Sequence, residues 1–223
     1  MRAILIPVKD LSRAKQRLAP AFSQEGRAVL ARAMMRDVFA AVAGVRGEHQ
    51  VYVASSDADA LAAAHAHGWE CLPEGAQISE SQSVDAASRV CAARGVTALL
   101  RLPIDIPLVR AEDVEEVLAA CPACDGAVLV PSRSGDGTNA LLRAHPELFP
   151  SRFGPGSLAK HLDEARQRNV ETRILRNPRI ELDVDDEADL HALAGCEGLG
   201  VHTAAALGEL GVPAALRSLA AGA

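Results

Sequence analysis

Residues 98–107 read ALLRLPIDIP, an apolar segment that runs into a turn with one aspartate, Asp105, between two prolines. The apolar part, 98–102, predicts a short buried strand. A second apolar run at 179–182 predicts another strand, which leads into a second acidic turn, Asp183-Val184-Asp185. In an open α/β sheet, side chains just beyond the carboxyl ends of strands converge on the ligand crevice. Both turns are therefore predicted to lie at a ligand site, and so apolar a setting for Asp105 favours function over a surface role.

Strands and helices alternate along the first 120 residues. Leu30, Met34 and Val38 follow four-residue steps, which predicts a helix over 24–42 with Ser23 as its cap. Ser56 and Asp59 resemble a capping box that opens the next helix. This alternation favours a parallel sheet with helices on both faces. The predicted strands are 2–8, 50–54, 69–72 and 97–102, and the predicted helices are 24–42, 56–68, 83–93 and 111–120.

The alternation breaks after a predicted strand at 127–131. A glycine-rich loop at 132–139 leads to a strand at 140–143 that is expected to return antiparallel. The fold class predicted for residues 1–194 is thus a single α/β domain with a mixed, mainly parallel sheet flanked by helices. Residues 195–223 predict a helical extension that packs on the domain or on a partner subunit, which leaves a homodimer open. The remaining predicted elements are a helix at 157–168, strands at 170–176 and 179–184, and an acidic helix at 186–193.

Composition excludes several classes of protein. A net charge of −6 argues against non-specific binding to nucleic acid or to an anionic membrane surface, both of which need a basic face. No signal peptide is visible, and no stretch approaches the roughly 20 apolar residues of a spanning helix, so the cytoplasm is expected. The five cysteines are expected to be reduced there. Cys121 and Cys124 have redox spacing but follow a predicted helix instead of opening one, which disfavours a redox site.

The loop after the first predicted strand is cationic. It carries Lys9, Arg13, Lys15 and Arg17, whose charges could hold a triphosphate and its leaving pyrophosphate. The loop is neither a P-loop nor a dinucleotide fingerprint, because GxxxxGK[ST] and GxGxxG are both absent. A solvated basic loop is the alternative explanation.

Two further turns combine glycine with small polar side chains. In residues 135–139, Thr138 and Asn139 supply a hydroxyl and an amide, although an ordinary hairpin turn would also explain them. In residues 153–157, Gly154 precedes Ser157, which is predicted to cap the helix that follows; backbone N–H groups at a helix start can bind an anion. His161, one turn further on, is expected to be a packing or surface residue.

The acidic turns predict a metal site. Asp183 and Asp185 alternate along an extended chain, so their side chains point to the same side and could share a cation. Together with Asp105 they offer the oxygen ligands that suit Mg²⁺, which usually keeps substrate phosphates in its shell. The competing explanation is an acidic first turn of the helix at 186–193, and it fits Asp183 least well.

Six motifs over about residues 2–193 together resemble the 2-phospho-L-lactate / phosphoenolpyruvate / 3-phosphoglycerate guanylyltransferase family of deazaflavin-coenzyme biosynthesis. They are PVK at 7–9, AKQRL at 14–18, PIDIP at 103–107, GTNAL at 137–141, FGPGS at 153–157 and LDVD at 182–185. The resemblance implies a Rossmann-like nucleotidyltransferase fold and Mg²⁺ held by the residues matching Asp105, Asp183 and Asp185. It also implies that the phosphorylated acid lies against Thr138, Asn139, Gly154 and Ser157.

The family implies transfer without a covalent enzyme intermediate. A phosphate oxygen of the acid attacks the α-phosphorus of GTP and pyrophosphate leaves, with Asp105, Lys15 and Lys9 as the catalytic residues. Lys9, Arg13, Lys15 and Arg17 would hold the nucleotide. Ser83 and Asp85 are also expected near it, although many family members have Gly-Leu-Asn where this chain has residues 83–85, SVD.

Several alternatives stay open from the sequence. The acceptor could be 2-phospho-L-lactate, phosphoenolpyruvate or 3-phospho-D-glycerate, because acids that differ by a few atoms are separated by pocket shape. A nucleotide-sugar-dependent glycosyltransferase could use the Asp183–Asp185 pair. A non-catalytic GTP-binding regulatory module is the alternative from a different class.

Overall fold

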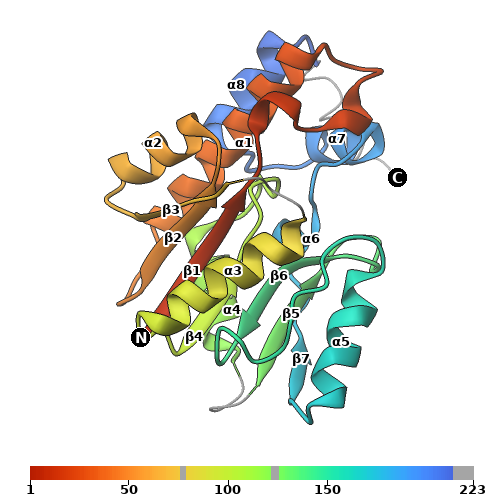
Figure 1. Ribbon diagram of the computed structural model, residues 1–223. Coiled ribbons are helices and arrows are strands. Elements are labelled where there is room, and N and C mark those ends of the chain that lie inside the picture. The colour runs from red at the N-terminus through yellow and green to blue at the C-terminus, as the bar shows by residue number, and fades with distance from the viewer. Residues whose placement is uncertain (76–78, 122–125, 213–223) are drawn as a thin grey trace.

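A computed structural model describes residues 1–75, 79–121 and 126–212 (Figure 1). Its seven-stranded sheet has the order β3-β2-β1-β4-β6-β5-β7. Strand β6 runs antiparallel to both of its neighbours, and the other pairs are parallel. The single α/β domain with a mixed, mainly parallel sheet is therefore confirmed, as is the antiparallel return. The strands are β1 Arg2–Val8, β2 Gln50–Ser55, β3 Glu70–Pro73, β4 Ala98–Arg101, β5 Ala127–Pro131, β6 Thr138–Arg143 and β7 Thr172–Ile174.

The central strand β1 shows why the sheet carries helices on both faces. Ile4 and Ile6 pack with α1, α2 and α4, whereas Ala3 and Leu5 face the opposite side and pack with α3. Successive side chains of a strand point to opposite faces, so a strand covered on both sides is apolar throughout. Helix α5 covers β5 and β6 on the α3 side (Figure 1). The helices are α1 Gln24–Ala43, α2 Ala58–Ala66, α3 Glu80–Ala93, α4 Ala111–Ala119, α5 Ser157–Gln167, α6 Pro178–Glu181, α7 Glu187–Ala194 and α8 Val201–Glu209.

Helix α8 packs along α1, so this part of the predicted extension lies on the domain (Figure 1). Its N-cap, Gly200, has no side chain to cap the helix. The buried carboxylate of Asp37, on α1, accepts hydrogen bonds from the N–H groups of His202 at 3.1 Å and Thr203 at 2.7 Å instead. Residues 213–223 of the extension lie outside the described residues.

The predicted strand at 179–184 is wrong. Residues Pro178–Glu181 form the short helix α6, and residues 182–185, which begin with Leu182 in an extended conformation, follow without regular secondary structure. Asn177 caps α6 by accepting from the N–H groups of Arg179 and Ile180, and Pro178 occupies the first turn. Asparagine at the N-cap and proline at the first position form a helix-start signal that the apolar run obscured.

Local boundaries differ from the predictions in four further places. Asp57, not Ser56, caps α2, because its carboxylate accepts from the N–H of Ala60. Helix α3 begins at Glu80, three residues earlier than predicted, with Ser79 as its cap. Gly156 in the left-handed conformation (φ 69°) is the N-cap of α5, so Ser157 is the first helical residue and not the cap. Strand β7 is shorter than the predicted 170–176.

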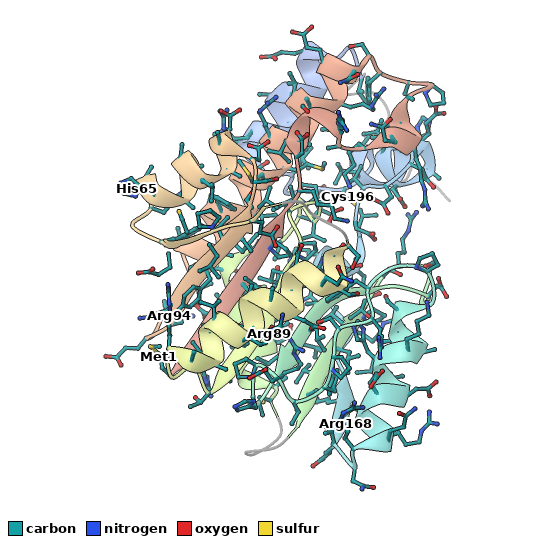
Figure 2. The ribbon with its side chains drawn as sticks, viewed as in Figure 1. Met1, His65, Arg89, Arg94, Arg168 and Cys196 are labelled. Atoms are coloured by element: carbon teal, nitrogen blue, oxygen red, sulfur yellow. The ribbon has the colours of Figure 1, made fainter. Side chains whose placement is uncertain are left out.

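Among the described cysteines, Cys71, Cys91 and Cys196 are free thiols. Cys124 lies outside the described residues. In the described ranges no helix combines the length and the apolar character needed to cross a membrane. Arg94 lies near Met1, at the end of the sheet where the chain begins, whereas Arg168 lies at the C-terminal end of α5 (Figure 2).

Candidate active site

A cavity of about 950 Å³ opens where β1 and β4 end. Because β6 is antiparallel, its first residues, Thr138 and Asn139, lie at this same edge of the sheet. Carboxyl ends of strands in an open α/β sheet form the usual ligand crevice. The cavity gathers nearly all of the residues predicted to be functional: Lys9, Arg13, Lys15, Arg17, Ser83, Asp105, Thr138, Asn139, Gly154, Ser157, Asp183 and Asp185.

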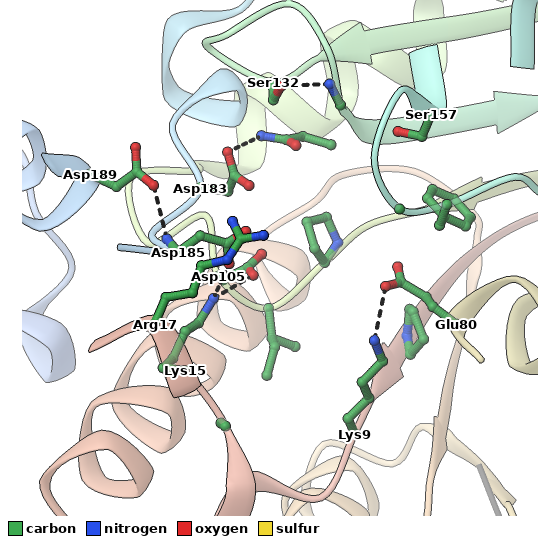
Figure 3. Close-up of a pocket in the computed structure, with 18 of the residues that line it drawn as sticks. Lys9, Lys15, Arg17, Glu80, Asp105, Ser132, Ser157, Asp183, Asp185 and Asp189 are labelled. Atoms are coloured by element: carbon green, nitrogen blue, oxygen red, sulfur yellow. Dashed lines mark hydrogen bonds and ion pairs between the residues drawn. The ribbon is translucent and has the colours of Figure 1, made fainter. Parts of the chain in front are cut away.

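The two acidic turns are joined directly. The N–H of Val184 donates to the carbonyl oxygen of Asp105 at 3.0 Å, which sets the turns side by side. Lys15 Nζ lies 2.7 Å from Asp105 Oδ2 and 3.1 Å from Asp185 Oδ1 (Figure 3). Asp183 Oδ1 accepts from Asn139 Nδ2 at 3.1 Å. The three predicted aspartates therefore meet around one ammonium group and one amide.

Asp105, Asp183, Asp185 and Lys15 form an acidic corner of the cavity. Burial and the neighbouring charges there shift the pKa values of Lys15, Asp105 and Asp183. Burial acts to lower the pKa of Lys15, but the carboxylates of Asp105 and Asp185 outweigh it and raise the pKa, so the ammonium stays charged. Burial acts to raise the pKa of Asp105, and Lys15 outweighs it and lowers the pKa. Among the described residues, no cationic side chain forms an ion pair with Asp183. Burial, with the charges of Asp105 and Asp185 added, raises the pKa of Asp183 to about 6.

Lys15 reaches the aspartates from a strained backbone. Its φ of 54° and ψ of 47° place it in the left-handed region, which costs a non-glycine residue about 1 kcal/mol or more. Its side chain is only 9% exposed. Such strain persists where the surrounding structure compensates for it, and here the two ion pairs do so. The loop thus directs one lysine inward, whereas its neighbours Arg13 and Arg17 remain exposed on the cavity wall.

The cationic loop has a second inward contact. Lys9, with a side chain 63% exposed, lies 3.3 Å from Glu80 Oε2 at the opposite side of the cavity from Asp183 (Figure 3). Glu80 also pairs with Arg101, the one charged residue of β4. An exposed lysine on the cavity wall can move to a phosphate group, since a surface ion pair holds it weakly.

The opposite wall carries small polar groups. Thr138 is 5% exposed and Ser157 is 2% exposed, and their hydroxyl oxygens lie 3.3 Å apart. Gly154 has a φ of 110°, a conformation that L side chains rarely adopt, and no atom approaches within 4 Å of where a Cβ would stand. The loop therefore needs glycine for its backbone and leaves open space at this position.

Asp85 is not brought into the cavity. Its carboxylate accepts from the N–H of Ser151 at 3.0 Å and lies 3.8 Å from Arg143, so it holds the loop that precedes α5. Ser83, one turn earlier on α3, does line the cavity. The structure therefore does not bring Asp85 to the cavity, and its contact with the nucleotide stays a prediction. Helix α3 begins three residues before the predicted start, and its first turn reaches the cavity instead.

The cavity is also lined by Glu80 and Arg101, which were not predicted to be site residues, and by Phe153, which was predicted only as part of the FGPGS motif. Arg101 Nη1 donates to the carbonyl oxygen of Asn139 at 3.0 Å, and its guanidinium lies 4.3 Å from the centre of the Phe153 ring. Arg101 thus links β6 to the loop before α5 in one buried contact set. The signal was present, because a single arginine inside an apolar strand needs a buried partner.

The donor set suits a hard cation, although Lys15 now occupies part of it. Over residues 1–75, 79–121 and 126–212, no group of three or more His, Cys, Asp or Glu side chains is already arranged to hold a metal ion. Asp105, Asp183 and Asp185 are the residues that could do so, since Mg²⁺ prefers carboxylate oxygens. The unneutralised charge at Asp183 is consistent with a second cation beside Lys15.

Two solved structures have the same fold as this chain. A Desulfovibrio desulfuricans G20 protein, provisionally named a nucleotide-diphospho-sugar transferase, superposes with a TM-score of 0.76 at 20% identity and covers 97% of each chain. A nucleotidyl transferase of Methanothermobacter thermautotrophicus superposes with a TM-score of 0.58 at 15% identity, covering 85% of this chain and 94% of that one. At these identities the likeness shows a shared nucleotidyltransferase fold.

Comparison of sequences shows the family. A phosphoenolpyruvate guanylyltransferase of Rubrobacter xylanophilus is 36% identical over 196 residues, which cover 87% of this chain and 94% of that protein. A 2-phospho-L-lactate guanylyltransferase of Methanothermobacter thermautotrophicus is 32% identical over 198 residues, which cover 89% and 86%. The family model described as "Guanylyl transferase CofC like" matches residues 1–219. The chain therefore belongs to the CofC-like guanylyl transferase family and is a nucleotidyltransferase.

Proposed function

We propose that this enzyme transfers the guanylyl group of GTP to the phosphate of phosphoenolpyruvate, with release of pyrophosphate, in biosynthesis of the deazaflavin hydride-carrier coenzyme. The observation that carries the proposal is the meeting of Asp105, Asp183 and Asp185 with Lys15 across one cavity from Thr138 and Ser157. Phosphoenolpyruvate is chosen over 2-phospho-L-lactate and 3-phospho-D-glycerate because relatives at 36% and 39% identity bear that name.

The acidic corner is the proposed place of reaction. Asp105, Asp183 and Asp185 would hold Mg²⁺, which when bound offsets negative charge on the attacking and leaving oxygens. Lys15, a buried positive charge paired with Asp105, would lie beside the α-phosphate, where charge develops as the bond to pyrophosphate breaks. Asn139 keeps the Asp183 carboxylate directed at the same point through its amide.

The cationic loop would hold the leaving group. Lys9, Arg13 and Arg17 line the cavity beside Lys15, and their charges match the β- and γ-phosphates that depart as pyrophosphate. Lys9 would give up its contact with Glu80 to reach them.

The opposite wall would hold the acceptor acid. Thr138 and Ser157, with the open backbone at Gly154, would offer hydrogen bonds to a carboxylate or a phosphate, and Asn139, whose amide donates to Asp183, would lie beside the acid. Their role is positioning: an acceptor oxygen held in line with the α-phosphorus needs no covalent enzyme intermediate.

A panel assay tests the proposal. Purified enzyme, GTP and MgCl₂ are incubated with each of the three acids, and pyrophosphate and the diphospho-guanosine product are quantified by a coupled assay and mass spectrometry. We expect one pyrophosphate per product and the highest kcat/KM with phosphoenolpyruvate. Chelation of Mg²⁺ by EDTA should abolish turnover, and excess MgCl₂ should restore it.

A matched pair of variants separates chemistry from folding. Asp105→Asn should lower kcat at least about 100-fold, as expected for loss of a charged group that acts in the transition state. Asp59→Asn, on the exposed surface of α2, should leave kcat unchanged. Absence of pyrophosphate with all three acids, or sugar transfer from GDP-mannose instead, would contradict the proposal.

A further inference from the structure

We infer that His161 holds the Thr138 hydroxyl as a fixed hydrogen-bond donor aimed at an anionic oxygen of the acceptor acid. This inference rests on the proposed function for the identity of the acid. His161 is wholly buried and does not line the cavity, so it would act through Thr138 as a positioning residue.

The tautomer of His161 follows from its contacts. The backbone N–H of Arg152 donates to His161 Nε2 at 2.8 Å, and a backbone N–H can only donate. Nε2 therefore carries no proton, and in the neutral ring the proton is on Nδ1. Nδ1 lies 3.1 Å from Thr138 Oγ1 and is the donor in that bond.

The His161 ring is neutral at pH 7 because its pKa is lowered. Burial, together with the positive charges of Arg143, Arg101 and Arg152, lowers the pKa of His161 to about 3. The edge of the ring also packs on Phe153, with ring centres 4.9 Å apart. Both hydrogen bonds of the imidazole are therefore fixed at neutral pH.

These contacts determine the direction of each hydrogen bond made by the Thr138 hydroxyl. A hydroxyl has two acceptor lone pairs and one hydrogen. One lone pair accepts from His161 Nδ1 and the other from Ser157 Oγ at 3.3 Å. The hydrogen has no acceptor within the described part of the chain, and Thr138 lines the cavity. Reversal of the Ser157 bond would only pass the free hydrogen to Ser157, which lines the cavity as well.

The chemical consequence is selectivity for an acceptor oxygen. A fixed outward O–H binds a carboxylate or phosphate oxygen and leaves a group that can only donate unpaired, at a cost in binding. The Arg101 guanidinium, which pairs with Glu80, lies behind Phe153 and Asn139 on the same side of the cavity. The cavity wall is thus built for an anion before any substrate arrives.

Two variants of His161 separate the effects of its two hydrogen bonds, one with Thr138 and one with Arg152. In His161→Asn the amide nitrogen stands near the Nδ1 position and can still donate to Thr138, whereas in His161→Gln the amide oxygen stands near Nε2 and can only replace the contact with Arg152. We expect His161→Gln to raise KM for phosphoenolpyruvate about 10-fold while KM for GTP stays within about twofold. His161→Asn should keep KM for phosphoenolpyruvate within about threefold of the wild type.

His65→Gln, at the exposed end of α2, is the matched control and should change neither constant (Figure 2). Equal effects of the two His161 variants on KM for phosphoenolpyruvate, or an equal rise in KM for GTP, would overturn the inference. Thermal melts of all three variants check that the comparison is made between folded proteins.

A second measurement needs no turnover. The ¹⁵N chemical shifts of the His161 ring, measured on the whole protein at pH 7, should show a protonated Nδ1 and an unprotonated Nε2. The opposite tautomer, or a charged ring, would overturn the inference even if the enzyme is active. The expected tautomer in a protein that turns over none of the three acids would instead contradict the proposed function and leave the Thr138 donor supported.

Discussion

Lys15 Nζ lies 2.7 Å from Asp105 Oδ2, although the two residues stand 90 positions apart. The same ammonium lies 3.1 Å from Asp185 Oδ1, so one buried cation neutralises part of a cluster of three carboxylates. The cluster is needed for the proposed cation, and Lys15 competes for its oxygens. The balance between the two cations gives the first prediction.

Lys15→Met should lower kcat at least about 100-fold, because a buried charge beside the α-phosphate is lost. The same change should strengthen divalent-cation binding in the absence of GTP about 10-fold, because two carboxylates lose their competing cation. Titration with Mn²⁺ followed by electron paramagnetic resonance measures this affinity. Arg36→Met, on the exposed side of α1, is the control. Weaker Mn²⁺ binding by Lys15→Met would show that the carboxylates do not hold a cation there.

Asp183→Asn should stabilise the fold at neutral pH and abolish activity. The folded-state pKa of Asp183 is about 6, above its ordinary 3.8, so the folded protein binds this proton more tightly than the unfolded chain does. The wild type therefore loses stability through this group as pH rises from about 4 to about 6. The variant avoids that loss and should exceed the wild type by about 1 kcal/mol at pH 7.5, allowing for partial exposure of the carboxylate.

Urea unfolding of both proteins between pH 4 and pH 7.5 measures this difference. The excess stability of Asp183→Asn should shrink toward zero as pH falls to 4, because the wild-type carboxyl is then protonated in the folded state. An excess that grows toward low pH would mean that the wild-type carboxylate is stabilised by a partner and not penalised by burial.

Lys9→Ala should weaken GTP binding without weakening the fold. Its ion pair with Glu80 is largely exposed, so its loss should change the free energy of unfolding by less than about 1 kcal/mol. Loss of a phosphate contact should raise KM for GTP about 10-fold and leave KM for the acid within about twofold. Initial-rate kinetics with each substrate varied in turn separates the two. A selective effect on the acid would place Lys9 at the other substrate.

Asp37→Ala should destabilise the protein by about 2 kcal/mol, because two N–H groups at the start of α8 lose a buried carboxylate acceptor. Asp59→Ala removes an exposed ion pair with Arg32 and should cost less than about 1 kcal/mol. Urea unfolding measures both. Because α8 packs on α1 outside the acidic corner, kcat of folded Asp37→Ala should match the wild type. A large loss of kcat would give α8 a part in the reaction.

The pattern of apolar residues along the chain was sufficient to predict most of the strands and helices. The apolar run of β1 and the four-residue steps of α1 report burial and periodicity within one segment, and both elements were predicted almost to their ends. The predicted strand at 179–182 was wrong because its two apolar residues, Ile180 and Leu182, fit a strand and a short helix equally well, and the cap at Asn177 decided between them. The family resemblance carried by six short motifs was confirmed.

What the sequence determined by itself was the set of chemical groups and, for Asp105, the strand that precedes it. Which groups meet was decided only by the tertiary structure. The order of strands sets β6 beside β4, which brings Thr138 and Asn139 to the edge where Asp105 stands, and the hydrogen bond from Val184 to Asp105 aligns the two acidic turns. The packing of whole elements also explains why Arg101 lines the cavity and Asp85, which was predicted to do so, does not. Periodicity is a property of neighbouring residues, whereas contacts between residues 90 or 170 positions apart depend on how whole strands and helices pack.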